Sequence, residues 1–244
     1  MTAQLAIPAT TVVLRTIVQR RIGLAYAGLT APTVSVEPPP RPPASPANGM
    51  AAAAQPEPAG LYLFLHHVVP NAAWRNYEPR PDGIGRQGGP SPLAVDLHYL
   101  LAATGAGLER EVLLGLGITA LNRHGIISRP LIRSILGAIS VADPSAPILD
   151  GLATEPLHDP AVQPERITVA QAPVDVDLST KIWSALQSPM RPCAHFLVTT
   201  VFLDIGETPP EAAEVTKVKV GVRPDAEPSF TLPPDDTVTA AGGG

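Results

Sequence analysis

Acidic, histidine and cysteine side chains are the groups in this sequence that could do chemistry, so their spacing is considered first. Asp96 and His98 lie two positions apart in an alternating apolar stretch, which places both on one face of a strand. A carboxylate and an imidazole on one face could bind a metal ion or act as an acid–base pair. The alternative, which we favour, is a hydrogen bond at a surface or an interface.

Cys193 and His195 form a second pair with the same separation, at the start of a predicted strand. A nucleophilic cysteine needs a base within hydrogen-bond reach and a third group that orients the base. The sequence shows no such third group, so we assign no catalytic cysteine. The other histidines, His66, His67 and His124, show no metal-ligand spacing, and adjacent residues of a strand are expected to point to opposite faces.

The glycine pattern of dinucleotide-binding loops occurs once, as Gly-Ile-Gly-Arg-Gln-Gly at 83–88. That pattern binds a pyrophosphate only between a strand and a helix, because the helix N-terminus must meet the phosphates. Here prolines stand before it at 79 and 81 and after it at 90 and 92, so we expect a loop. The sequence therefore predicts no catalytic residue, no cofactor and no metal site.

Composition excludes several classes of protein. The 244 residues include 30 prolines, and proline ends helices because it lacks an N–H and fixes φ, so an all-helical protein is excluded. A net charge of −5 without a basic stripe argues against nucleic acid as a partner. Arg15, Arg20 and Arg21 interrupt the apolar N-terminal stretch, so we expect neither a secretory signal nor a membrane-inserted segment. A single cysteine fits the reducing cytoplasm.

Hydrophobic periodicity and the positions of proline predict the elements that hold these side chains. Helices are expected over 8–27, 107–123, 130–139 and 177–187. Strands are expected over 33–36, 61–69, 93–101, 166–169, 194–205 and 215–222. The strand at 194–205 is apolar on both faces and is expected to be central or covered by an interface. The last strand alternates and is typical of an antiparallel edge strand; its residues are Val215, Lys217, Val218, Lys219 and Val220.

The helix predicted at 177–187 carries an apolar stripe of Leu178, Ile182 and Leu186. Trp183 lies one position from this stripe and is expected to be a core or core-edge anchor. Its indole N–H would then need a hydrogen-bond partner.

Three proline-rich segments, 37–60, 78–92 and 141–164, separate these elements. They contain too few large apolar side chains to offset the entropy lost on ordering, so we expect extended or disordered loops. The tail from 223 to 244 is also expected to be disordered. The sum is a single α+β domain over 1–222, with a mostly antiparallel sheet and helices packed on one face.

Four stretches together resemble one family, the cap or tail-terminator proteins of phage-tail-like contractile injection systems, in particular their N-terminal cap domain. The stretches are 61–65 with Asn71, Arg75 and Asn76 after it; 92–101 with Asp96, His98 and Tyr99; the helix at 113–115 leading to Ile126 and Ile127; and 178–187 with Lys181, Trp183 and Ser184. The resemblance covers about residues 5–207. A longer insertion at 38–60 and the stretch Met190-Arg191-Pro192-Cys193 depart from the family pattern.

The resemblance implies a tail-terminator-like fold and a structural role. Such proteins form a six-fold ring on the distal end of the inner tube and sheath, end tube growth and anchor the last sheath layer. The implied partners are copies of the chain, the tube protein and the sheath protein, with assembly in the cytoplasm and no cofactor. The motif residues named above would be structural or interface residues, and the strand at 215–222 could complete strand edges exposed at a polymer end.

Two alternatives stay open. One is a small monomeric enzyme that uses Asp96 with His98 or Cys193 with His195. The other is an adaptor that docks cargo or a membrane through the proline-rich loops, of which 38–46 could form a polyproline ligand.

Overall fold

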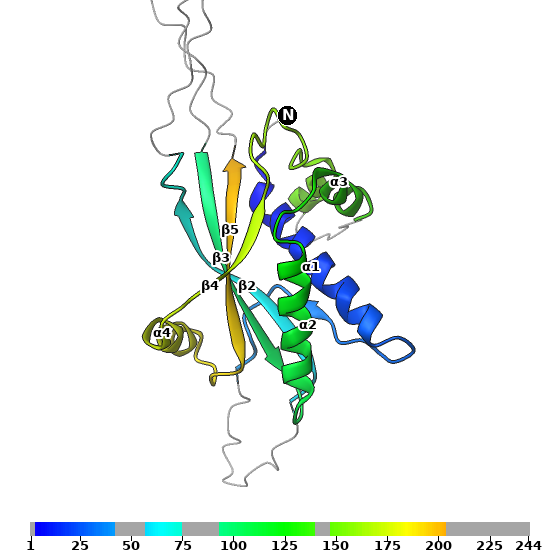
Figure 1. Cartoon of the computed structure of the whole chain (residues 1–244), viewed down its shortest axis with the longest axis vertical. Helices are drawn as coiled ribbons and strands as arrows, with labels where there is room; N and C mark the ends of the chain where they lie inside the picture. Colours follow the sequence, from blue (N-terminus) through cyan, green and yellow to red (C-terminus); the bar gives the residue numbers. More distant parts are fainter. Residues whose placement is uncertain (1–2, 42–56, 75–92, 140–146, 204–244) are drawn as a thin grey trace, which may run out of the picture. The chain divides into compact units, whose positions relative to one another are not determined.

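The computed structural model describes residues 3–41, 57–74, 93–139 and 147–203 (Figure 1). The chain divides into two units, Met1–Pro209 and Pro210–Gly244, and all described residues belong to the first. Several predicted features lie outside the described residues: the glycine pattern at 83–88, the loop at 78–92, Arg75 and Asn76, the strand at 215–222 and the tail at 223–244.

A five-stranded sheet in the order β1-β2-β3-β5-β4 forms the centre of the described part. The strands are β1 (Val34–Ser35), β2 (Gly60–Pro70), β3 (Leu93–Thr104), β4 (Thr168–Ala172) and β5 (Cys193–Leu203). β3 pairs antiparallel with β2 and β5, β4 pairs antiparallel with β5, and β1 pairs parallel with β2. β5 lies between β3 and β4, which confirms that the strand with two apolar faces is central.

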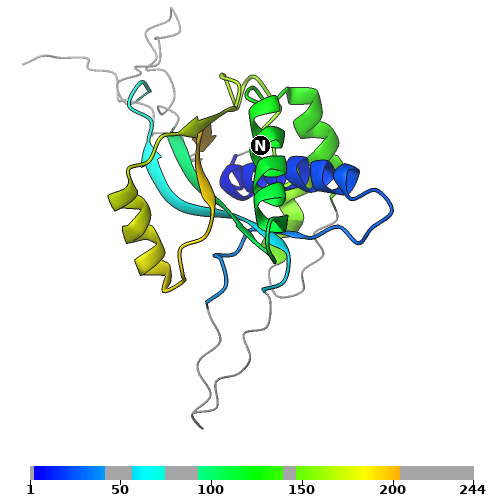
Figure 2. The ribbon, with the colours of Figure 1, turned by 60° about the horizontal axis from the view of Figure 1, so that its bottom comes forward.

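The main core lies between one face of this sheet and a layer of helices (Figure 2). The layer contains α1 (Ala6–Ala25), α2 (Glu109–Arg123), α3 (Arg129–Gly137) and the 3-10 helix η1 (Pro147–Thr154). Buried side chains of the helices, such as Val13 and Leu113, join Leu63, Leu101 and Val198 of the strands in this core. Within the described residues, none of the helices has the length and apolarity needed to cross a membrane.

The fourth helix, α4 (Val176–Leu186), packs on the opposite face of the sheet, so the prediction of helices on one face only is wrong (Figure 2). Trp183 is 2% exposed and forms a small second core with Leu100 and Ala102 of β3. The cause is the alternation of β3: its odd-numbered residues, such as Leu101, face the main core, and its even-numbered residues face α4. The sequence shows both faces as apolar but not which helix covers each.

The stripe predicted on α4 is rotated in the structure. Ser179 and Trp183 are the buried residues, whereas Leu178 is 50% exposed. Trp183 is the anchor that was expected. Its buried indole N–H, however, has no hydrogen-bond partner among the described residues, contrary to the prediction.

The proline-rich segment at 141–164 is not a structureless connection where the structure describes it. Its part from 147 onward contains η1 and buries Leu152 and Leu157 in the main core. The carboxylate of Glu155 accepts a hydrogen bond from the backbone N–H of Leu5 at 3.1 Å. These buried contacts hold the segment in place, although its average composition predicts a loop.

Candidate functional site

Four histidines meet in a pocket of about 300 Å³ between the sheet and α4. The residues that line this histidine pocket are His66, His67, His98, Val174, Leu178, Ile182, His195 and Phe196. The ring centroid of His66 lies 6.2 Å from that of His98 and 5.7 Å from that of His195. The rings of His67 and His98 are 5.5 Å apart. Histidines that show no useful spacing in the sequence are therefore neighbours in space.

An irregularity in β2 explains why two adjacent histidines line the same pocket. The pairing with β3 shifts between Leu65, which is opposite Tyr99, and His67, which is opposite His98. His66 is therefore the extra residue of a β-bulge, where two residues of one strand face one residue of its partner. The prediction that His66 and His67 point to opposite faces is wrong, because it assumed a regular strand.

Burial and mutual repulsion lower the pKa values of three of these imidazoles. The pKa of His66 falls to about 4, chiefly because burial disfavours the charged form and also because His195, His98 and His67 would repel it. Burial likewise lowers the pKa of His195 and of His98, although the charge of Asp96 partly opposes the effect at His98. Two unit charges about 6 Å apart repel by about 3 kcal/mol at an effective dielectric constant of about 20. These shifts favour the neutral form of the three rings.

His195 does not form a catalytic pair with Cys193. The imidazole is only 8% exposed, and neither ring nitrogen has a hydrogen-bond partner among the described residues. Cys193 packs beside the small core of Leu100, Ala102 and Trp183. The pair therefore lacks the contact that a thiol nucleophile and its base require.

Asp96 and His98 do not form an acid–base pair either. Asp96 Oδ1 accepts a hydrogen bond from Asn71 Nδ2 at 2.8 Å, whereas His98 lines the histidine pocket. Asn71 also fixes the turn after β2, since its Oδ1 accepts hydrogen bonds from the backbone N–H groups of Ala73 and Trp74. Among the described residues, no three His, Cys, Asp or Glu side chains are placed so that they could hold a metal ion.

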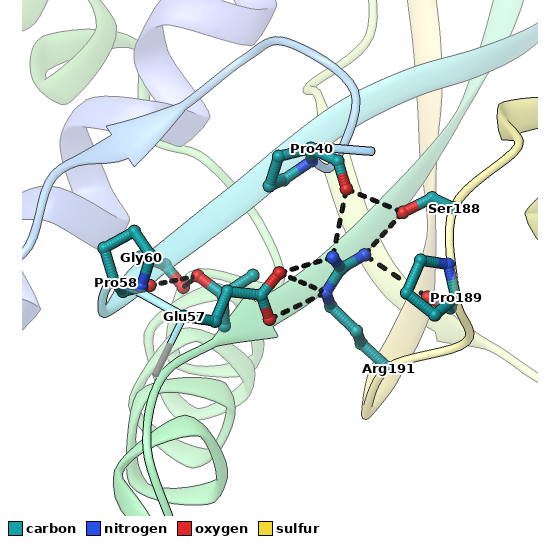
Figure 3. A network of polar contacts seen from close by, with 8 residues as sticks. Pro40, Glu57, Pro58, Gly60, Ser188, Pro189 and Arg191 are labelled. Carbon is teal, nitrogen blue, oxygen red and sulfur yellow. Dashed lines mark hydrogen bonds and ion pairs between the residues drawn. The ribbon is translucent and has the colours of Figure 1, made fainter. Parts of the chain in front are cut away.

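A second polar cluster, the Arg191 network, lies after α4 (Figure 3). The Nε of Arg191 donates to both carboxylate oxygens of Glu57, at 3.1 and 3.0 Å, and Nη2 donates to Glu57 Oε1. The remaining hydrogen bonds go to Ser188 Oγ at 2.5 Å and to the carbonyl oxygens of Pro189 and Pro40 at 3.2 and 3.0 Å. The buried guanidinium is thus surrounded by acceptors.

The Arg191 network joins the described residues on either side of 42–56 to the turn after α4. Pro40 stands just before this segment and Glu57 just after it. Ser188 Oγ donates a second hydrogen bond to the carbonyl oxygen of Pro40, at 2.8 Å. The prediction for 37–60 was an extended or disordered loop; its described ends are bound to the folded domain, and its last residue, Gly60, begins β2.

The other predicted site residues lie in separate parts of the fold. Tyr99 is fully buried, its hydroxyl forms a 2.7 Å hydrogen bond with Thr11 Oγ1, and burial raises its pKa. Lys181 and Asp177 form a solvent-exposed ion pair at 2.6 Å on α4. Ser184 is exposed on the same helix. The motif residues thus do not converge on one catalytic centre within the described part of the chain.

The family model described as the Pvc16 N-terminal domain matches residues 9–217, which is most of the chain. The chain belongs to this family. The match confirms the resemblance found in the sequence. No curated protein is similar enough to count as a match.

Two solved structures resemble this Pvc16 N-terminal domain. One is the sheath/tube terminator of the PVC extracellular contractile injection system in its extended state, with 14% identity, a TM-score of 0.47, and coverage of 90% of this chain and 65% of that chain. The other is the tube-terminating cap of the anti-feeding prophage, with 14% identity, a TM-score of 0.43, and coverage of 85% and 59%. The chain spans less than two thirds of the length of either.

Two features of this Pvc16 N-terminal domain escaped the sequence analysis. The histidine pocket depends on a bulge that the strand pattern does not reveal. The ion pair of Arg191 with Glu57 joins residues 134 positions apart, and both stand in proline-rich stretches. The sequence signal for this ion pair was Arg191, which belongs to a stretch that departs from the family pattern.

Proposed function

We propose that this chain is a structural cap subunit of a contractile injection system. It ends polymerisation of the inner tube and anchors the last sheath layer at the baseplate-distal end. The observation that carries the proposal is the Pvc16 N-terminal domain match over residues 9–217. The two similar solved structures are described as a sheath/tube terminator and as a tube-terminating cap.

The proposed cap works as a homohexameric ring that is assembled in the cytoplasm and contacts the tube protein and the sheath protein. The six-fold symmetry rests on the family resemblance. Exposed apolar side chains support assembly: Leu24 and Leu29 stand at the end of α1, and Leu108 stands at the start of α2. A hydrogen bond between Tyr26 and Glu109, at 3.2 Å, holds these two helix ends together. These exposed leucines lie close in sequence to the two bonded residues and are available to be covered in an assembly.

A cap needs no reacting side chains, and the proposal includes no enzymatic activity. Of the two candidate pairs, Asp96 accepts a hydrogen bond from Asn71, and neither ring nitrogen of His195 has a hydrogen-bond partner among the described residues. Asn71, Asp96 and Trp183 then serve structural roles, and the exposed Lys181 and Ser184 are available to an interface.

Deletion of the chain from a particle-producing cell tests the proposal. Without the cap, tube growth has no defined end, so particles should vary widely in length or lack their baseplate-distal end. Expression of the wild-type chain from a second copy should restore a uniform length. Particles of normal length with an intact distal end, in a strain shown to lack the chain, would contradict the proposed function.

A further inference from the structure

We propose that the histidine pocket is a cooperative proton-binding site that releases α4 from the sheet in mildly acidic surroundings. The proposal concerns the chain itself and does not depend on its role as a cap. It rests on the arrangement of the pocket, on the charges that face it, and on the way in which α4 is held.

The four imidazoles come from three different strands and face the same helix. His66 and His67 belong to β2, His98 to β3 and His195 to β5. Their neighbouring ring centroids are separated by 5.5–6.2 Å. A proton on any of the rings therefore places its charge beside another imidazole and against a half-buried apolar wall.

Little negative charge faces the pocket to balance such protons. The segment before α4 and α4 itself contribute only apolar side chains to its wall, namely Val174, Leu178 and Ile182. The charged residues of the helix, Asp177 and Lys181, are exposed to solvent and paired with each other.

The charged groups on the neighbouring strands also place little negative charge near the pocket. On β3, Asp96 acts on His98 but already accepts a hydrogen bond from Asn71. Beyond α4, the positive charge of Arg191 is paired with Glu57. Among the described carboxylates, Asp96 is the one that acts on the three imidazoles whose pKa is lowered, and it acts on His98.

The attachment of α4 is separate from the main core. Its apolar contact with the sheet is Trp183 against Leu100 and Ala102, with Ile182, Leu186 and Cys193 around them. The end of the helix is also held by Arg41, whose Nε donates a hydrogen bond to the carbonyl oxygen of Leu186 at 3.2 Å. The main core lies on the other face of the sheet. Release of α4 therefore leaves the packing of the other helices in place.

The direction of the pH dependence follows from where the protons bind. Burial in the pocket lowers the pKa of His66 to about 4 and also lowers the pKa values of His98 and His195. Once α4 is released, water reaches the rings and their pKa values return toward about 6.5. The released state binds more protons between these limits, so attachment weakens as the pH falls through this range. Release exposes all the rings to water in one conformational change, and this shared change makes proton uptake cooperative.

Trp183 provides a direct reporter of this release. The experiment uses the full chain with Trp74→Phe, which leaves Trp183 as the only indole, in the presence of a metal chelator. Between about pH 7.5 and about pH 5, the acrylamide quenching constant of Trp183 should rise about threefold or more while far-UV circular dichroism stays unchanged. No rise, or a rise that coincides with loss of the far-UV signal, would overturn the proposal.

Histidine variants identify the source of the transition. His66→Gln combined with His195→Gln removes two protonation sites and should abolish the rise or move it lower by more than about one pH unit. His124→Gln is the matched control, because His124 lies outside the pocket and contacts the carbonyl oxygen of Ala120. It should behave like the parent. An unchanged transition in the double variant would overturn the proposal.

A measurement on the unmodified chain covers the case in which the double variant does not fold. Nuclear magnetic resonance can follow the imidazole carbons of His66, His98 and His195 during an acid titration. The proposal predicts that they titrate below the ordinary value, together and more steeply than one-proton curves. Independent titration near about 6.5 would overturn it.

Discussion

The two ion pairs in the described part of the chain differ in how deeply their side chains are buried. The side chains of Arg191 and Glu57 are 7% and 37% exposed, whereas those of Lys181 and Asp177 are 70% and 69% exposed. Exposed pairs are screened by water and contribute little to stability. A buried guanidinium that loses its carboxylate keeps an uncompensated charge, so the Arg191 pair should matter much more.

Glu57→Gln tests this difference because it removes the charge while nearly preserving the shape of the side chain. We expect it to lower the free energy of unfolding by about 1–3 kcal/mol, less than for a fully buried pair because Glu57 is partly exposed. Urea denaturation gives the value. Asp177→Asn is the matched control and should cost less than about 0.5 kcal/mol. Equal effects of the two substitutions would contradict this view of the Arg191 network.

The buried hydroxyl of Tyr99 is the basis of a second prediction for a single residue. It forms a hydrogen bond with Thr11 Oγ1 inside the main core, between α1 and β3. Tyr99→Phe should lower the free energy of unfolding by about 1 kcal/mol. A double-mutant cycle with Thr11→Ala should give a coupling energy of at least about 0.5 kcal/mol. Additive effects of the two substitutions would show that the bond contributes nothing.

Single residues were predictable from the sequence where their environment is local. Trp183 was expected in a core because of its place on a helix, and it is buried. The hydrogen bond of Asp96 was expected, but its partner Asn71 stands 25 positions away. The contacts of Arg191 and the closeness of the four histidines depend on long-range pairing and on a bulge, which residue types alone do not reveal.

Helix α2 packs closely against the sheet at Gly117, where there is little room for a larger residue. A Cβ added at Gly117 would lie 2.9 Å from Leu101 Cδ2 and 2.9 Å from Leu61 Cδ2. Both leucines are fully buried, so they have little room to move. Gly115, in the same helix, has no atom within 4 Å of such a Cβ.

Gly117→Ala and Gly115→Ala therefore form a matched pair. Alanine favours the helix by about 0.5–1 kcal/mol at either position, but at Gly117 overpacking should cost about 1–3 kcal/mol. We expect Gly115→Ala to raise the midpoint of thermal unfolding and Gly117→Ala to lower it. Calorimetry of the two variants gives the comparison. A stabilised Gly117→Ala protein would show that α2 can move away from the sheet at no cost.

A further prediction concerns the strand expected at 215–222, which lies outside the described residues. We propose that it completes a strand edge at the end of the particle. Val218→Pro removes a backbone N–H and should weaken anchoring of the sheath without unfolding the chain. Val218→Ala keeps the N–H and is the control. Co-sedimentation with sheath gives the readout, and equal recovery of the two variants would contradict the proposal.

Element types were more predictable than their arrangement. The helices at 6–25, 109–123 and 129–137 lie within two residues of their predicted bounds, because apolar periodicity and proline positions are local signals. The placement of α4 on the second face and the order within 147–164 were missed. Both depend on which apolar surfaces meet, and sequence periodicity does not specify that.

For the whole molecule, the sequence is enough to assign the family, but it does not determine how copies of the chain assemble. Four short stretches were enough to suggest the cap family, and the match over residues 9–217 confirms it. The contacts between copies, tube and sheath lie between different chains. No pattern within one chain determines their symmetry, so the ring stays a proposal.

Electron cryomicroscopy of the baseplate-distal end of isolated particles is the most direct test of the proposed cap. We predict a six-fold ring at this end, in which the sheet of each subunit and its α4 can be traced, in contact with both the last tube ring and the last sheath layer. Particles whose distal end contains a different protein, while this chain is elsewhere or absent, would contradict the account.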